Sequence, residues 1–210
     1  MEKSEVLRII EAKKLVPVIR TSSADEARQA VEVLSSVGMG IFEITLTTPN
    51  AIELIKELAD TNSEILLGAG TVLNAEQAEN CIEAGAKFIV SPIFDAEIVK
   101  FCNAKKIAVM SGALTPTEVF TAWSEGADVV KVFPCDALGG AKYVKTLKSV
   151  FPNIKIMPTG GVSLETIADF LKSGVIAVGV GTDLVDVKAI WEGNLEIIAE
   201  KSRKYLEAVK

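Results

Sequence analysis

The chain has 210 residues, of which 49% are hydrophobic and 24% are charged, and its formal net charge is −6 at pH 7. This composition is typical of a soluble globular protein, and the acidic balance argues against nucleic acid as a partner. The sequence contains no histidine, which excludes Ser-His and Cys-His nucleophile pairs, imidazole acid-base catalysis and histidine-ligated metals.

The composition is even along the chain, without a linker rich in proline, serine or glycine, so we expect one domain over residues 1–210. The first ten residues lack the apolar core of a signal peptide, and no later segment is long enough to span a membrane. A cytoplasmic protein without a membrane partner is therefore predicted. Cys81, Cys102 and Cys135 form no CxxC pattern, and we expect Cys81 and Cys102 to be core thiols. Cys135 follows the predicted strand 126–134, where a position near a site is the alternative to the passive role that we expect.

Hydrophobic periodicity predicts a short helix over residues 4–13, followed by alternating strands and helices. Strands are predicted at residues 15–19, 41–46, 65–68, 88–91, 107–110, 126–134, 154–158 and 175–179. Capping residues predict where helices begin: Ser22 and Ser23 before residues 24–37, Thr48-Pro49, Asn74, the capping box Thr115 to Glu118, and Ser163. A last helix over residues 187–209 is expected to be interrupted around Gly193.

Four glycines repeat at a regular spacing. Gly38, Gly85, Gly126 and Gly174 each follow a helical pattern, and 47, 41 and 48 residues separate them. If each separation spans two strand-helix units, one unit has a little over twenty residues. Eight such units predict an α/β fold, a (β/α)₈ TIM barrel, with a doubly wound open sheet as the alternative.

Lys131 stands in the middle of the β-branched stretch 126–134, which has the character of a buried strand. Burial disfavours the ammonium form, so a neutral amine that attacks a carbonyl carbon to form a Schiff base is predicted. The alternative is a lysine at a strand end that reaches water or pairs with an acid.

Glu43 is a second ionisable residue in a predicted strand. Period-2 alternation places it on one face with Ile41 and Thr45, and the opposite face is a suitable set to pack against helices. Two inward ionisable groups in one barrel serve each other or a ligand. A structural ion pair between Glu43 and Lys131 is the alternative to a site.

Three glycine-containing loops follow predicted strands. The loop 68–71 ends in Thr71, whose hydroxyl and neighbouring amides suit a carboxylate. The loops 158–163 and 179–182 follow the last two strands, where phosphate sites recur in such barrels. The segment 179–182 lacks the third glycine and the acidic partner of a dinucleotide fingerprint.

Five segments together resemble the KDPG/KHG aldolase family, in which KDPG is 2-keto-3-deoxy-6-phosphogluconate and KHG is 4-hydroxy-2-ketoglutarate. They are residues 42–46 (FEITL), 68–74 (GAGTVLN), 88–92 (FIVSP), 131–134 (KVFP) and 158–161 (PTGG). The resemblance implies a class I aldolase of the Entner-Doudoroff type that works through a lysine imine, without metal or cofactor. It also implies a homotrimer that cleaves KDPG to pyruvate and glyceraldehyde 3-phosphate, and 4-hydroxy-2-oxoglutarate to pyruvate and glyoxylate.

Carried over by position, the resemblance assigns Lys131 as the Schiff-base lysine and Glu43 as the general acid/base. The substrate-binding positions are Thr71, Thr47, Arg20, Pro92, Phe133 and Thr159. The phosphate-binding positions are Gly160, Gly161, Gly181 and Thr182.

The sequence departs from the family at loop positions. Thr47 stands where many members have an arginine that holds the ketoacid carboxylate, and Arg20 is the candidate substitute. Ser111 stands at a usual proline, Thr182 at a frequent serine, and residues 93–94 and 135–136 also differ. These changes leave the C4 epimer and the need for phosphate open.

Two other functions fit the same residues. A phosphate-binding barrel isomerase or epimerase would use Glu43 as its base and Lys131 as an electrostatic partner. A barrel that binds a phosphorylated metabolite without catalysis would hold the two as an inert pair.

Overall fold

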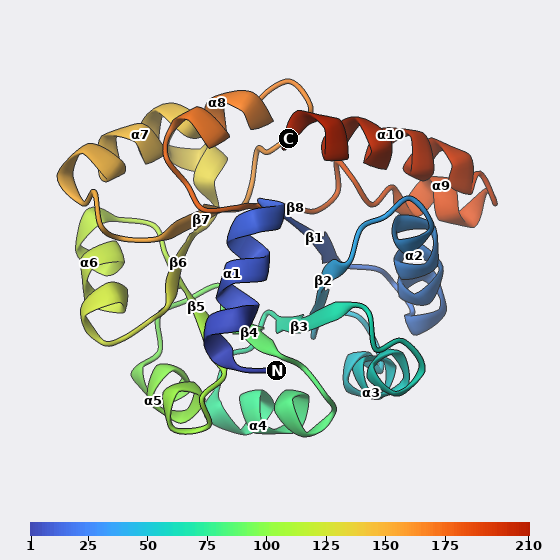
Figure 1. Cartoon of the computed structure of the whole chain (residues 1–210), viewed down its shortest axis with the longest axis horizontal. Coiled ribbons are helices and arrows are strands. Elements are labelled where there is room, and N and C mark those ends of the chain that lie inside the picture. Colours follow the sequence, from blue (N-terminus) through green and yellow to red (C-terminus); the bar gives the residue numbers. More distant parts are fainter.

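The computed structural model describes residues 1–210 and contains eight parallel strands in one sheet (Figure 1). The strands are β1 (Leu15–Ile19), β2 (Ile41–Thr45), β3 (Leu66–Gly70), β4 (Phe88–Val90), β5 (Ala108–Ala113), β6 (Val129–Val132), β7 (Ile156–Pro158) and β8 (Val178–Val180). Neighbours in sequence pair throughout, β1 pairs with β8, and a parallel bridge between Thr159 and Gly179 links β7 to β8. The sheet therefore closes into the predicted barrel, and the open-sheet alternative is excluded.

The first helix precedes β1 and lies across one end of the barrel, and the later helices form the outer layer in Figure 1. The helices are α1 (Lys3–Lys13), α2 (Ala24–Ser36), α3 (Ala51–Thr61), α4 (Ala75–Glu83), α5 (Ala96–Ala104), α6 (Pro116–Ser124), η1 (Cys135–Leu138), α7 (Ala141–Val150), α8 (Ile167–Lys172), α9 (Val187–Trp191) and α10 (Leu195–Ala208). The break between α9 and α10 falls at Gly193, as predicted. None of these helices has the length and apolar character needed to cross a membrane.

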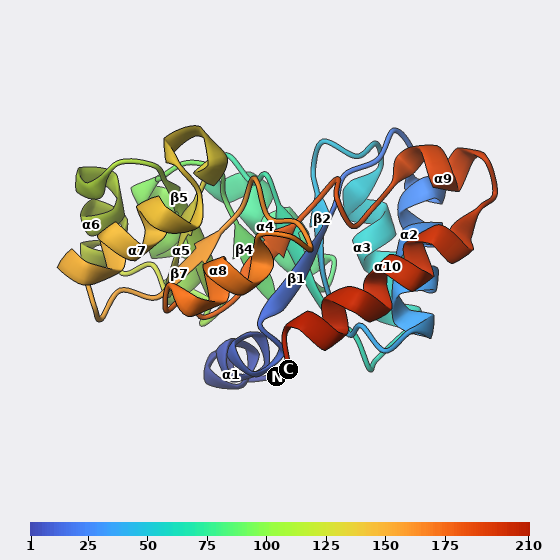
Figure 2. The same ribbon diagram turned by 90° about the horizontal axis from the view of Figure 1, so that it is seen from above.

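The strand residues are buried on both faces, which is why their sequences are apolar with little alternation. One face packs on the helices, and the other fills the N-terminal half of the barrel with an interior core. Helix α1 adds Val6 and Ile10 to this interior core and lies across that end of the barrel (Figures 1 and 2). Lys3 ties α1 to Asp128 with an ion pair of 2.8 Å. The N-terminal end of the barrel interior is thus closed.

The helix-ending glycines follow the prediction. Gly38, Gly85, Gly126 and Gly174 have φ of 96°, 110°, 97° and 85°, which is the left-handed region that glycine enters without strain. Each of them ends a helix just before the chain turns back into the barrel.

Two predicted helix starts were wrong. Helix α3 begins at Ala51 after Asn50, so Pro49 precedes the cap and is not the first helical residue. Helix α8 begins at Ile167 with Thr166 as its N-cap, and Ser163 lies in the turn that leads into it, where its hydroxyl accepts from the Glu165 amide and its carbonyl from the Ile167 amide.

Candidate active site

Strands β2 and β6 bring a lysine and a glutamate together inside the barrel. Lys131 Nζ donates to Glu43 Oε1 at 3.3 Å, and the two residues are 4% and 0% exposed. Both side chains point inward, as the alternation of their strands predicted. Glu43 Oε2 is buried and has no hydrogen-bond partner in the protein. The pair therefore has one carboxylate oxygen left for another molecule, which a self-contained ion pair would not leave.

Missing side chains make room for this pair. Gly70 on β3 faces Glu43, and a Cβ atom there would lie 2.1 Å from Glu43 Oε1. Gly112 on β5 is the register partner of Lys131. The backbone of Pro92 fills the space that a Cβ atom of residue 112 would take. The Phe133 ring covers the amine, with its centroid 5.5 Å from Lys131 Nζ.

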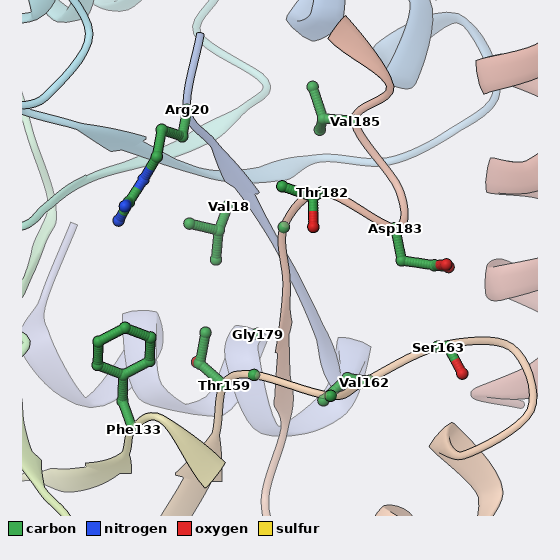
Figure 3. A pocket seen from close by; sticks show the side chains of 13 residues that line it. Val18, Arg20, Phe133, Thr159, Val162, Ser163, Gly179, Thr182, Asp183 and Val185 are labelled. Carbon is green, nitrogen blue, oxygen red and sulfur yellow. The ribbon is translucent and has the colours of Figure 1, made fainter. Parts of the chain in front are cut away.

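A cavity of about 500 Å³ opens at the C-terminal end of the strands (Figure 3). Thirteen residues line it: Val18, Arg20, Phe133, Thr159, Gly160, Gly161, Val162, Ser163, Gly179, Gly181, Thr182, Asp183 and Val185. Seven of them were predicted as site residues. Lys131 and Glu43 do not line this cavity; Phe133, two residues beyond Lys131 on the same strand face, connects it to the buried pair.

The loops after β7 and β8 present free backbone amides to the cavity. The N–H groups of Gly160, Gly161, Val162, Gly181 and Thr182 donate to no other group of the protein. Unpaired amides gathered at one concave surface are suited to the oxygen atoms of an anion. This end of the cavity is therefore a candidate phosphate site, in the loops that the sequence indicated.

Gly160 and Gly161 are required for two reasons. Their φ angles are 99° and 72°, and a Cβ on either would lie within 2.8 Å of the Asp136 side chain. The same loop is tied to η1, because the Cys135 amide donates to the Thr159 carbonyl at 2.9 Å. Strand β6, which carries Lys131, and the candidate phosphate loop are thus joined by a hydrogen bond.

Arg20 links the cavity to Thr71 on the loop after β3. It follows β1, lines the cavity, and its Nη2 lies 3.5 Å from Thr71 Oγ1. Thr71 has φ of 59°, a left-handed conformation that is unusual for a β-branched residue.

Three of the predicted substrate-binding residues, Thr71, Thr47 and Pro92, lie outside the cavity lining, and Thr71 is linked to it only through Arg20. Thr47 is exposed and shares a hydrogen bond of 2.9 Å with Thr45, while Pro92 packs behind Gly112, beside the lysine strand. Many family members have an arginine at the position of Thr47. In this chain the positive charge at the cavity comes from Arg20 instead.

Thr159 carries an unsatisfied hydroxyl in the cavity wall. The residue is 7% exposed, its Oγ1 has no partner, and it fills the space that a Cβ of Gly179 would take. A buried hydroxyl without a partner is uncommon and suits a hydrogen bond with a bound ligand.

Several lining residues were not identified from the sequence. Val18 could have been found, because it shares the inward face of β1 with Val16. Val162 and Ser163 belong to the loop 158–163 that the sequence indicated, and Val185 follows the loop 179–182. Asp183 carried no signal, since an acidic residue in a loop is usually solvated.

The three cysteines are buried and unpaired, which confirms them as core thiols. Burial raises the pKa of each thiol to about 12, and the Cys135 thiol donates a hydrogen bond to the Gly140 carbonyl, at 3.7 Å. No three Cys, Asp or Glu side chains gather closely enough to hold a metal ion.

The sequence matches the KDPG and KHG aldolase family over residues 6–201. The chain belongs to this family. It is 32% identical to the 2-dehydro-3-deoxy-phosphogluconate aldolase of Haemophilus influenzae, over 98% of this chain and 97% of that one. It is 33% identical to the 2-dehydro-3-deoxy-6-phosphogalactonate aldolase of Escherichia coli K12, over 93% and 96% of the two chains.

A solved structure of the KDPG aldolase from Legionella pneumophila, with pyruvate captured as a covalent carbinolamine intermediate, superimposes on this aldolase with a TM-score of 0.87. The two are 30% identical, and the match covers 97% of each chain. The protein is therefore an enzyme of the aldehyde-lyase class. In this aldolase an amine and a carboxyl group are in contact below a cavity with free amides, an arrangement able to exchange protons during addition to a carbonyl.

Proposed function

We propose that this aldolase is a class I enzyme that cleaves a phosphorylated 2-keto-3-deoxy sugar acid, KDPG or its C4 epimer, to pyruvate and glyceraldehyde 3-phosphate. The observation that carries the proposal is the buried contact of 3.3 Å between Lys131 Nζ and Glu43 Oε1. No metal or cofactor is needed, because a protonated lysine imine supplies the electron sink.

The first steps use the shared proton of the buried pair. When Glu43 holds the proton, the neutral Lys131 amine attacks the C2 carbonyl of the substrate and forms a carbinolamine. Glu43 then protonates the leaving hydroxyl, water departs, and an iminium ion remains on Lys131.

Cleavage follows from the position of the iminium. A carboxylate oxygen of Glu43, such as the unpartnered Oε2, takes the proton of the C4 hydroxyl. The C3–C4 bond breaks, its electron pair moves to the iminium to give an enamine, and the aldehyde leaves. Glu43 returns a proton to C3, and hydrolysis of the imine releases pyruvate and restores Lys131.

The two ends of the substrate are assigned to two ends of the site. Arg20 and Thr71, whose side chains are 3.5 Å apart, are proposed to hold the carboxylate, and the unpartnered Thr159 hydroxyl is proposed to bond a substrate hydroxyl. The free amides of Gly160, Gly161, Gly181 and Thr182 are proposed to bind the phosphate.

A homotrimer is proposed together with this activity, on the family resemblance. Light scattering after size-exclusion chromatography tests it by giving the mass of the assembly relative to the 22.4 kDa chain. KHG, which is shorter and lacks the phosphate, is a second substrate in this proposal.

Borohydride reduction tests the lysine chemistry. Reduction in the presence of pyruvate is expected to add a pyruvate-derived mass to the peptide that contains Lys131, and Lys131→Ala is expected to abolish both labelling and pyruvate release. Glu43→Gln should lower kcat by about 10²–10⁴-fold and leave part of the labelling, because proton transfer is lost while the amine remains.

Three outcomes would contradict the proposal. An active enzyme without label would favour an isomerase that uses Glu43 as its base. A protein that binds its ligand equally well as Lys131→Met and releases no pyruvate would be a binding protein. Equal kcat/KM for phosphorylated and unphosphorylated substrates would remove the phosphate assignment.

A further inference from the structure

One side chain in the cavity wall is held from behind by the last helix. Asp183 lies in the turn after β8 and lines the cavity. Its Oδ2 accepts a hydrogen bond from the Tyr205 hydroxyl, and its Oδ1 lies 3.0 Å from Lys201 Nζ. Tyr205 and Lys201 are one turn apart on α10, and they contact a loop about twenty residues earlier in the chain.

Asp183 sits at the tip of a tight turn. The Gly181 carbonyl accepts from the amides of Leu184 and Val185, both at 2.9 Å, and this closes the turn around Asp183. The amides of Gly181 and Thr182, which are proposed to bind phosphate, belong to the same turn. The direction of these amides therefore depends on what fixes the turn.

Tyr205 is an unusually firm anchor. It is 0% exposed, and its hydroxyl has Asp183 as its sole partner. A buried hydroxyl and a carboxylate that share one hydrogen bond are both destabilised if the bond is lost, because each would be left unpaired. The contact is thus a specific constraint on the turn.

The orientation of Asp183 also matters for charge. A carboxylate in the wall of an anion site repels a phosphate unless it is turned away or neutralised. In Figure 3 the Asp183 side chain points away from Arg20 and Phe133, whereas the Thr182 hydroxyl points toward the space between the loops. Lys201 neutralises the carboxylate on its far side.

We infer that Tyr205 and Lys201 are positioning residues for phosphorylated substrates: by holding Asp183, α10 fixes the phosphate-binding turn and keeps a negative charge out of the site. This inference rests on the proposed function. It adds a specificity determinant that contacts no substrate.

The test compares two tyrosine variants. Tyr205→Phe removes the hydroxyl that holds Asp183. Tyr143→Phe is the matched control, because Tyr143 is the other of the two tyrosines and its hydroxyl donates to the Leu114 carbonyl at 2.5 Å, outside the cavity lining. Each variant is assayed for inhibition by inorganic phosphate, for kcat/KM with phosphorylated and unphosphorylated keto acids, and for borohydride trapping with pyruvate.

Tyr205→Phe is expected to weaken inhibition by phosphate and to lower kcat/KM for the phosphorylated substrate by roughly 10-fold, the scale of one hydrogen bond to a charged group. Trapping of pyruvate and kcat/KM for the unphosphorylated substrate should stay within about twofold of wild type. Tyr143→Phe should leave the preference for phosphate unchanged. Lys201→Met, a substitution at a half-buried residue outside the apolar core, should shift the preference in the same direction.

Other outcomes overturn the inference. They are an unchanged preference in both Tyr205→Phe and Lys201→Met, or an equal loss with both substrates and in trapping, which is what general destabilisation would produce. A wild-type enzyme that phosphate does not inhibit would overturn this inference and the phosphate assignment together. Pyruvate trapping at Lys131 would still stand in that case, so failure of the inference is distinguishable from failure of the aldol chemistry.

Discussion

Replacing Gly70 by alanine tests whether the position of Glu43 controls the reaction. The added Cβ would lie 2.1 Å from Glu43 Oε1, whereas ordinary contacts begin at 3.4 Å. The backbone of β3 is fixed by its pairing with β2, so the carboxylate has to move by about 1 Å or more. A displacement of that size at a reacting group costs about 100-fold, so kcat for pyruvate release should fall by roughly that factor.

The assay separates this effect from general damage. Pyruvate release is followed with a coupled dehydrogenase, imine formation by borohydride trapping at Lys131, and folding by the unfolding temperature. Gly40→Ala is the control, because a Cβ there meets nothing within 4 Å and the residue lies three positions before Glu43. In the Glu43→Gln background, Gly70→Ala should cause little further loss. A Gly70→Ala enzyme with more than half of wild-type kcat, or an equal loss in both backgrounds, would refute the reasoning.

Arg20→Met should raise KM for the keto acid about tenfold or more with a smaller change in kcat, whereas Thr47→Val should change KM little. Steady-state kinetics compares the two variants, and a larger rise in KM for Thr47→Val would return the carboxylate contact to Thr47. Ser111→Ala should raise the free energy of unfolding by about 1 kcal/mol, because the buried Ser111 hydroxyl has no partner; a loss of stability in urea titration would contradict this. The native thiols should resist iodoacetamide at pH 8, since burial raises the pKa of Cys135 to about 12 and keeps the thiol protonated at lower pH. Mass spectrometry with and without denaturant measures the alkylation, and rapid labelling of the folded enzyme would show that Cys135 is accessible.

Much of the fold was predictable because local chemistry repeats along the chain. The helix-ending glycines mark where the backbone takes a left-handed conformation, which glycine adopts most easily. Their spacing therefore predicted the eight strand-helix units that the structure contains. Period-2 alternation also placed Lys131 and Glu43 inside the barrel, since a strand that faces helices on one side leaves the other side for the interior.

The remaining site features depend on contacts between distant segments. Gly70 is a loop glycine in the sequence, and its role as the space for a carboxylate exists only because β2 and β3 pair in one register. Asp183 is unremarkable until α10 returns to hold it. The start of α3 was misplaced because proline just before a helix and proline in its first turn have the same local sequence signature.

The closure of the barrel floor by Val6, Ile10 and Phe88 constrains the order of events in the proposed reaction. Reactants reach Lys131 only through the mouth at the opposite end, and the departing aldehyde occupies that passage. The water that hydrolyses the remaining imine enters through the same open end of the barrel. Because the pyruvate part stays bonded to Lys131 until the imine is hydrolysed, the three-carbon aldehyde of the proposed reaction exits first, and pyruvate is the last product to leave.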